Sequence, residues 1–110
     1  MSAEPDDPPA HPALAFDDVV HQRTRLGILA ILAEADRADF GYLRSVLGLT
    51  DGNLGRHLEV LAGAGLITLV KGFQARRPRT WAAISPLGRS ALANELRQMR
   101  ALLDSLDGHA

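Results

Sequence analysis

The sequence contains no cysteine among its 110 residues. Disulfide bonds, zinc fingers and thiolate metal sensors are therefore excluded, and the absence fits a reducing cytoplasm. The four histidines are too scattered along the chain to predict a metal site: His11, His21, His57 and His109. We expect neither a metal ion nor a cofactor.

Long apolar runs are missing as well. The longest, from Leu26 to Ala33, is far shorter than the roughly 20 residues that a membrane-spanning helix needs. The N-terminus has neither a basic start nor an apolar signal core, so secretion is not expected. These absences predict a cytoplasmic protein that does not act at a membrane.

Patterns typical of enzymes are also absent from the sequence. The serines at positions 45, 85, 90 and 105 have no nearby histidine and acid in the arrangement that nucleophilic catalysis uses. No glycine-rich phosphate loop follows a predicted strand. We therefore expect a protein without enzymatic activity.

Charge is distributed unevenly along the chain. Residues 1–18 hold five acidic residues and no basic one, whereas the remainder holds eight acidic and twelve basic residues, a net charge of +4. A protein that binds DNA needs local positive charge rather than a basic total. The overall net charge of −1 therefore does not exclude a nucleic-acid partner.

The first 13 residues combine prolines with small and acidic residues, a composition that cannot bury enough apolar area to offset its chain entropy. We predict a disordered tail over residues 1–13, one folded domain over residues 14–107 and a flexible end over residues 108–110. In the domain, a first helical piece holds Phe16, Val19 and Val20. A core helix follows from about Arg23 to Glu34, and the spacing leaves open whether the two are separated near Gln22.

The stretch LRSVLGLTDGNLGRHLEVL, residues 43–61, carries two helices with a tight corner between them. Gly48 ends the first helix, because glycine adopts the left-handed conformation without a Cβ clash. Thr50 caps the second helix, and its neighbour Asp51 suits the positive helix end. Leu54, Leu58 and Leu61 repeat at i, i+4 and i+7, which predicts one buried face. Two helices joined in this way form a helix-turn-helix, whose second helix can enter a DNA major groove.

The exposed side of that second helix has the residues that a DNA reader would need. Asn53 can form paired hydrogen bonds with adenine, and Arg56 can do so with guanine. Gly52 and Gly55 would allow the helix backbone to come close to a phosphate or base edge, whereas an ordinary solvated helix face is the competing interpretation. The residues predicted to contact DNA from this helix are Thr50, Asp51, Gly52, Asn53, Gly55, Arg56 and His57.

Two strands follow, from Leu66 to Lys71 and from Thr80 to Ile84, and a residue pair near positions 38–40 could add a short third strand. The link GFQARRPR between them is predicted to be a loop of about eight residues without an acidic residue. Basic residues here can pair with phosphates or enter a narrow minor groove, whereas a solvated charged loop is the alternative. The predicted DNA contacts of this hairpin are Lys71, Gln74, Arg76, Arg77 and Arg79.

Helices followed by a two-stranded hairpin make a winged helix. In RLGILAIL, LGLTDGNLGRHLEVLAGAGLI, RRPRTWAAISPLGR and the long terminal helix, the sequence resembles winged-helix bacterial transcription regulators of the MarR-like and ArsR-like kind. The likeness is greatest to the small group that has little beyond the DNA-binding domain, and it covers Phe16 to about Leu103. It implies an α+β, mainly helical fold and a homodimer that binds operator DNA. Many relatives carry serine where this chain has Gly55, so we expect one phosphate hydrogen bond to be missing.

The last helix is expected from Pro86 to about Asp107, with Ser85 as its cap. Its apolar residues are spaced 4, 3, 4 and 3 apart, as in a coiled-coil seam, and the second half of the seam continues beyond what a small domain can cover. We therefore predict a homodimer in which Phe16 and Val20 assist the terminal helix. The predicted interface comprises Phe16, Val20, Leu92, Leu96, Met99, Leu103 and Leu106.

These expectations combine into a DNA-binding transcriptional regulator, acting as a repressor on a palindromic operator. The serious rival is a winged-helix adaptor that binds proteins instead of DNA, because a fold does not fix a function. A small apolar effector between the helices of the dimer is a further alternative that no residue names.

Overall fold

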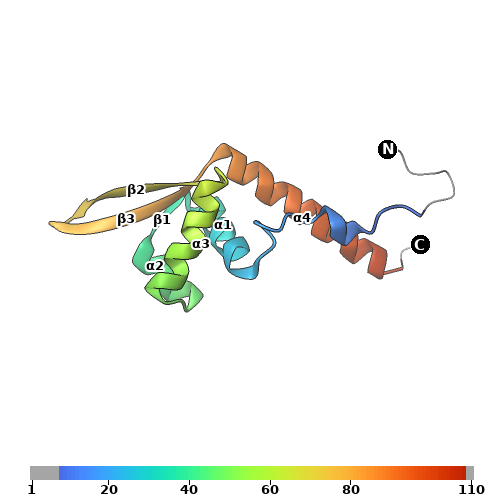
Figure 1. Cartoon of the computed structure of the whole chain (residues 1–110), viewed down its shortest axis with the longest axis horizontal. Helices are drawn as coiled ribbons and strands as arrows, with labels where there is room; N and C mark the ends of the chain where they lie inside the picture. Colours follow the sequence, from blue (N-terminus) through green and yellow to red (C-terminus); the bar gives the residue numbers. More distant parts are fainter. Residues whose placement is uncertain (1–7, 109–110) are drawn as a thin grey trace.

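The computed structural model describes residues 8–108, which form four α-helices, a 3-10 helix and a three-stranded sheet (Figure 1). In chain order the elements are η1 (Pro12–Ala15), α1 (Arg23–Ala35), β1 (Arg37–Asp39), α2 (Phe40–Leu47), α3 (Asp51–Gly63), β2 (Ile67–Gln74), β3 (Arg77–Ile84) and α4 (Pro86–Leu106). The short strand anticipated near positions 38–40 is β1. Within the described residues, no helix is both long and apolar enough to span a membrane.

The segment before α1 differs from the prediction. Residues 1–7 of the predicted tail lie outside the described residues, whereas Pro12 and Ala13 belong to η1, which packs against α4. The helical piece predicted over Phe16–Val20 is wrong, because these residues form a turn and a bend. Asp17 explains the turn: its carboxylate accepts hydrogen bonds from the N–H groups of Val19 and Val20, which takes those donors away from a helix. Gln22 then caps α1, so the separation left open near this residue exists.

The sheet has the order β1-β3-β2, with both neighbouring pairs antiparallel. Strands β2 and β3 pair over their whole length, from Ile67 opposite Ile84 to Gln74 opposite Arg77. The predicted eight-residue loop is therefore wrong: only Ala75 and Arg76 connect the strands, and both have positive φ, of 51° and 68°. Such a two-residue turn matches the twist of the flanking strands. We call the β2–β3 hairpin the wing.

Two residues that favour a loop in the sequence lie within the strands for identifiable reasons. Gly72 faces Trp81, and a Cβ atom at position 72 would lie 3.3 Å from Cζ3 of the tryptophan ring. Pro78 lies beyond the end of β1, which pairs only with residues 81–83, so its missing N–H breaks no bond on that side. The wing is consequently a long ribbon that extends away from the helices (Figure 1).

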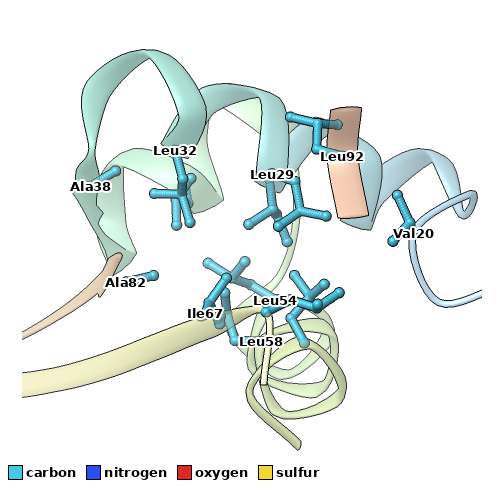
Figure 2. Close-up of a cluster of buried hydrophobic side chains, with 13 residues drawn as sticks. Val20, Leu29, Leu32, Ala38, Leu54, Leu58, Ile67, Ala82 and Leu92 are labelled. Carbon is cyan, nitrogen blue, oxygen red and sulfur yellow. The ribbon is translucent and has the colours of Figure 1, made fainter. Parts of the chain in front are cut away.

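The core lies where α1, α3 and the base of the sheet meet (Figure 2). Its fully buried apolar side chains come from helices α1, α2 and α3 and from the turn before α1: Val20, Ile28, Leu29, Leu32, Leu43, Leu54 and Leu61. Gly88 brings α4 against the base of the wing, because a Cβ atom there would lie 2.0 Å from the carbonyl oxygen of Leu66. The wing and the terminal helix are thus fixed to one another at their shared base.

Helices α2 and α3 form the predicted helix-turn-helix. Gly48 ends α2 in the left-handed conformation with φ of 65°, and its N–H bonds back to the carbonyls of Arg44 and Ser45. The hydroxyl of Thr50 accepts from the N–H of Asn53 at 3.2 Å and so caps α3. The molecule measures 65 × 30 × 23 Å, with the tip of the wing and the end of α4 at opposite extremes (Figure 1). The predicted α+β winged-helix architecture is confirmed.

Candidate nucleic-acid interface

Helix α3 presents one polar side to solvent because its other side is fixed in the core. Leu54, Leu58 and Leu61 are buried beneath it. At a helical period of 3.6 residues, the opposite side carries small and polar residues, all of them exposed: Gly52, Asn53, Arg56 and Glu59. The structure therefore places the predicted base-reading residues on an accessible helix surface.

The two predicted base readers contact each other. Nη2 of Arg56 donates to Oδ1 of Asn53 at 3.0 Å, a bond between residues three positions apart on the helix. Arginine has five N–H donors, so Arg56 keeps free donors for a base or a phosphate while it holds Asn53. The pair presents both side chains together rather than as independent groups.

Gly52 and Gly55 are not needed for packing within the chain. A Cβ atom built at either position meets no atom within 4 Å. Each glycine nevertheless costs about 1 kcal/mol of helix stability relative to alanine. The surface of α3 is therefore unusually flat at these two positions, which leaves room for another molecule to approach the backbone.

Arg44 was missed by the sequence analysis. It projects from α2, and its Nη1 donates to Oδ1 of Asp51, the first residue of α3, at 2.6 Å. The side chain of Arg44 is 43% exposed and that of Asp51 is 72% exposed, so this ion pair contributes little to stability. Its consequence is positional, because Arg44 places positive charge beside the N-terminal end of α3. The only hint in the sequence was a basic residue in the last turn of the first helix of the motif.

A cleft of about 340 Å³ lies between α2 and β3 and collects positive charge. Arg44 lines it from α2, and Arg77 and Arg79 line it from the wing. Arginine forks suit phosphate oxygens, to which they can donate two parallel hydrogen bonds. The cleft therefore brings arginines of α2 and of the wing close together.

The predicted wing residues are all exposed, but they are not equally available. Arg76 occupies the turn at the tip, and Lys71, Gln74 and Arg77 lie along the strands. Arg79 instead donates from Nη1 to Oδ2 of Asp39 at 2.9 Å. The segment between the predicted strands contains no acidic residue, but Asp39 of β1 lies beside Arg79 in the folded chain. The positive charge of Arg79 is therefore partly offset.

His57 lies at the edge of the α3 surface and contacts α1. Its Nδ1 is 3.2 Å from Nη1 of Arg25, a residue that the sequence analysis did not select. Burial lowers the pKa of His57 below its usual value, and the charges of Arg25 and Arg56 lower that pKa further. The neutral ring is therefore favoured near neutral pH.

Within residues 8–108, no cluster of three or more histidine, cysteine, aspartate or glutamate side chains could hold a metal ion. The interface described above combines the Asn53 amide and several guanidinium groups with the carboxylates of Asp39, Asp51 and Glu59. Amide and guanidinium groups can hydrogen-bond to base edges and phosphates.

A family model described as a winged helix DNA-binding domain matches residues 24–103. The chain belongs to this winged-helix DNA-binding domain family. It is 34% identical over 92 residues to an uncharacterized protein of Methanocaldococcus jannaschii, covering 84% of this chain and 96% of that protein. Family and fold identify a DNA-binding transcriptional regulator, a class that is typically non-enzymatic.

Solved structures agree with this assignment. A transcriptional regulator homologue from Pyrococcus horikoshii is 35% identical, with a TM-score of 0.78 over 83% of this chain and 90% of that one. The regulator MosR of M. tuberculosis, solved in complex with DNA, shares the fold at 21% identity and a TM-score of 0.67, over 90% of this chain and 71% of its own. The resemblance to winged-helix regulators is confirmed.

Helix α4 divides the predicted dimer interface into two parts. Val20 and Leu92 are 0% and 7% exposed in the core of the single chain, so their assignment to an interface is corrected. Leu96 packs on the edge of that core, and Phe16 and Met99 are half-buried. Leu103 and Leu106, by contrast, are 59% and 72% exposed. The N-terminal half of the seam thus packs against the core of the single chain, whereas its C-terminal half is exposed to solvent.

Proposed function

We propose that this winged-helix regulator binds a palindromic operator as a homodimer and represses the adjacent gene. The observation that carries the proposal is the series of arginines on neighbouring elements: Arg56 on α3, Arg44 and Arg77 around the cleft between α2 and β3, and Arg76 at the tip of the wing. A protein-binding adaptor has no use for such a series, whereas the phosphate backbone of a duplex runs past a recognition helix and its wing in this way.

The homodimer rests on the uncovered half of α4. Leu103 and Leu106 lie in the last two turns of the helix, far from the core, and Leu14 of η1 is 79% exposed. Exposure of this apolar surface to water costs about 25 cal/mol for each Å². A second copy of α4 would cover it and would set two recognition helices on one operator, so that the DNA site reflects the two-fold symmetry of the protein.

Repression follows most simply from occupancy. A dimer seated on a promoter competes with polymerase for the same DNA and needs no activating surface. An effector that releases the dimer from DNA stays a prediction, because the described residues do not indicate which ligand would bind.

The test is selection of bound fragments from random genomic DNA by the wild-type chain, followed by a gel-shift assay on the enriched sequence. We expect an inverted repeat to be enriched and to reduce transcription when it is placed across a promoter in a reporter. The double variant Asn53→Ala with Arg56→Ala is the matched control and should enrich no sequence. Enrichment of nothing by the wild-type chain would favour the adaptor, and enrichment of a single half-site would contradict the dimer.

A further inference from the structure

Arg25, at the start of α1, makes three contacts that hold its guanidinium in one place. Its Nε donates to the carbonyl oxygen of Val19 at 2.7 Å, and its Nη2 donates to that of Asp18 at 3.3 Å. Its Nη1 lies 3.2 Å from Nδ1 of His57 on α3. The side chain thus connects the turn before α1 to the recognition helix, and its donors are directed inward rather than toward a ligand.

The turn that holds Arg25 is itself fastened to α4. Glu95 is fully buried, and its Oε1 accepts from the N–H of Asp17 at 2.9 Å. Its Oε2 lies 2.5 Å from Nδ1 of His21, whose ring stacks on that of Phe16 with 4.2 Å between centroids. Carbonyls 18 and 19 lie between these two anchors, so the acceptors of Arg25 occupy fixed positions.

The contact with Arg25 determines which nitrogen of His57 carries the proton. An arginine guanidinium has only donors and stays charged, so the nitrogen that faces it must be an acceptor. Nδ1 of His57 is therefore unprotonated, and the proton of the neutral ring lies on Nε2. Among the described residues, Nε2 has no hydrogen-bond partner.

We propose that Arg25 is a positioning residue that fixes the His57 tautomer, so that α3 offers DNA a hydrogen-bond donor at Nε2 and no acceptor. This inference rests on the proposed function, because the acceptor of the hydrogen bond from Nε2 belongs to the operator. Purine N7 and O6 atoms and phosphate oxygens are acceptors of this kind. A cytosine amino group at the same position would face a second donor, so Arg25 sets a sequence preference from outside the recognition helix.

The first experiment uses the free protein and needs no DNA. Long-range ¹H–¹⁵N spectra of the ¹⁵N-labelled chain should show a pyridine-like Nδ1 and a pyrrole-like Nε2 for His57. Arg25→Met removes the donor and the charge, so the spectra should change to a mixture of tautomers and the pKa of His57 should rise. Arg23→Met removes the same charge two residues earlier on α1, from an exposed side chain, and should change neither. A wild-type ring with its proton on Nδ1 would overturn the proposal.

The second experiment uses the operator selected by the wild-type chain. In His57→Gln the amide oxygen can accept from Arg25 and the amide nitrogen can donate to DNA. His57→Leu should bind roughly 3- to 10-fold more weakly than the wild type, as expected for one hydrogen bond, and His57→Gln should recover part of that loss. Equal losses in the two variants would overturn the role assigned to Nε2.

Modified DNA distinguishes the two sources of the acceptor. If a base accepts this hydrogen bond, removing the acceptor from one purine should weaken binding of the wild type but not of His57→Leu. A 7-deaza analogue removes N7, and 2-aminopurine in place of guanine removes O6. If a phosphate accepts the hydrogen bond, a methylphosphonate at one backbone position should weaken binding of the wild type but not of His57→Leu. That result would support Nε2 as a donor but contradict the sequence preference assigned to Arg25. A wild-type chain that binds no DNA overturns both this inference and the proposed function, and the spectra then report separately whether Arg25 holds the ring.

Discussion

Asp39 and Arg79 join the wing to the start of the helix-turn-helix, with 2.9 Å between Oδ2 and Nη1. The other carboxylate oxygen of Asp39, Oδ1, accepts from the N–H of Tyr42 at 2.7 Å and caps α2. One side chain therefore performs two tasks that can be separated by mutation. As a cap it stabilises α2, and as an anion it offsets the charge of a wing arginine.

The change Asp39→Asn should strengthen DNA binding. Asparagine is as good a helix cap as aspartate, so α2 should be retained, while the loss of the carboxylate leaves Arg79 available to a phosphate. One additional phosphate contact should steepen the log–log salt dependence of affinity by about 0.9. Gel-shift titrations over a range of salt concentrations measure this slope.

The matched control is Asp39→Ala, which also releases Arg79 but removes the cap. It should show the same salt slope with a free energy of unfolding lower by about 1 kcal/mol. If Asp39→Asn leaves the slope unchanged, Arg79 does not contact DNA even when it is free of Asp39.

The helix-turn-helix and the core could be predicted from sequence because their signals are local. The apolar spacing of Leu54, Leu58 and Leu61 and the stop at Gly48 depend on neighbours within one or two helical turns. The contact between Asp39 and Arg79 could not be predicted, because the two residues are 40 positions apart and meet only when β1 pairs with β3. Arg44 and Arg25 were missed for the same reason, since each acquires its role from a partner on another element.

The wing shows how local signals can also mislead. Gly72 and Pro78 favour loops by propensity, yet both lie in strands. Trp81 fills the space above Gly72, and β1 pairs only with residues 81–83 of β3, so Pro78 needs no N–H on that side. The turn residues Ala75 and Arg76 carry no turn signal, although both adopt positive φ. Strand pairing over eight residues on each side therefore overrides the local preference of the turn.

The turn at the tip of the wing should accordingly be open to improvement. A side chain in the left-handed region costs about 1–2 kcal/mol, and asparagine tolerates this conformation better than alanine. Ala75→Asn should raise the free energy of unfolding by up to about 1 kcal/mol, whereas Ala75→Val, which is β-branched, should lower it. Denaturant unfolding measures both, and a stabilising valine would contradict the turn geometry.

The bond between Asn53 and Arg56 predicts that their contributions to binding are not additive. Arg56→Ala should cost roughly 1–3 kcal/mol on the selected operator and weaken the preference at one base pair. Because each residue orients the other, a double-mutant cycle with Asn53→Ala should show a coupling energy of about 0.5 kcal/mol or more. Glu59→Ala on the same exposed side is the control and should not weaken binding. Equal losses on operator and random DNA would show that Arg56 contacts only phosphate.

The lowered pKa of His57 predicts a loss of stability in mild acid. The unfolded chain has the ordinary histidine pKa of about 6.5, so it takes up the proton before the folded chain does as the pH falls. The free energy of unfolding should therefore be constant above about pH 6.5 with respect to this group, and should decline below it until the lower folded pKa is reached. Denaturant unfolding across this range should show less of this decline in His57→Gln than in the wild type. His11→Gln is the control for histidine removal, and a wild-type decline retained in full by His57→Gln would contradict the prediction.

The exposed end of α4 gives the sharpest test of the dimer, because its substitution should not disturb the single chain. Leu103 and Leu106 lie outside the core, so the double change Leu103→Glu and Leu106→Glu should leave the folded domain intact. It should nevertheless prevent a second α4 from packing there, since two carboxylates would lose their hydration in an apolar seam. We expect a folded monomer that loses most of its affinity for an inverted repeat.

The matched control places the same two charges on the opposite side of the same helix turns, as Ala101→Glu with Ser105→Glu, where both residues are exposed. Sedimentation should find this variant dimeric and the leucine variant monomeric, with circular dichroism reporting similar helix content in both. A wild-type chain that sediments as a monomer at micromolar concentration, yet binds an inverted repeat tightly, would rule out dimerisation through α4 before binding. Equal loss of the dimer in both variants would instead attribute the effect to added charge, because only the leucine variant removes apolar surface from the seam.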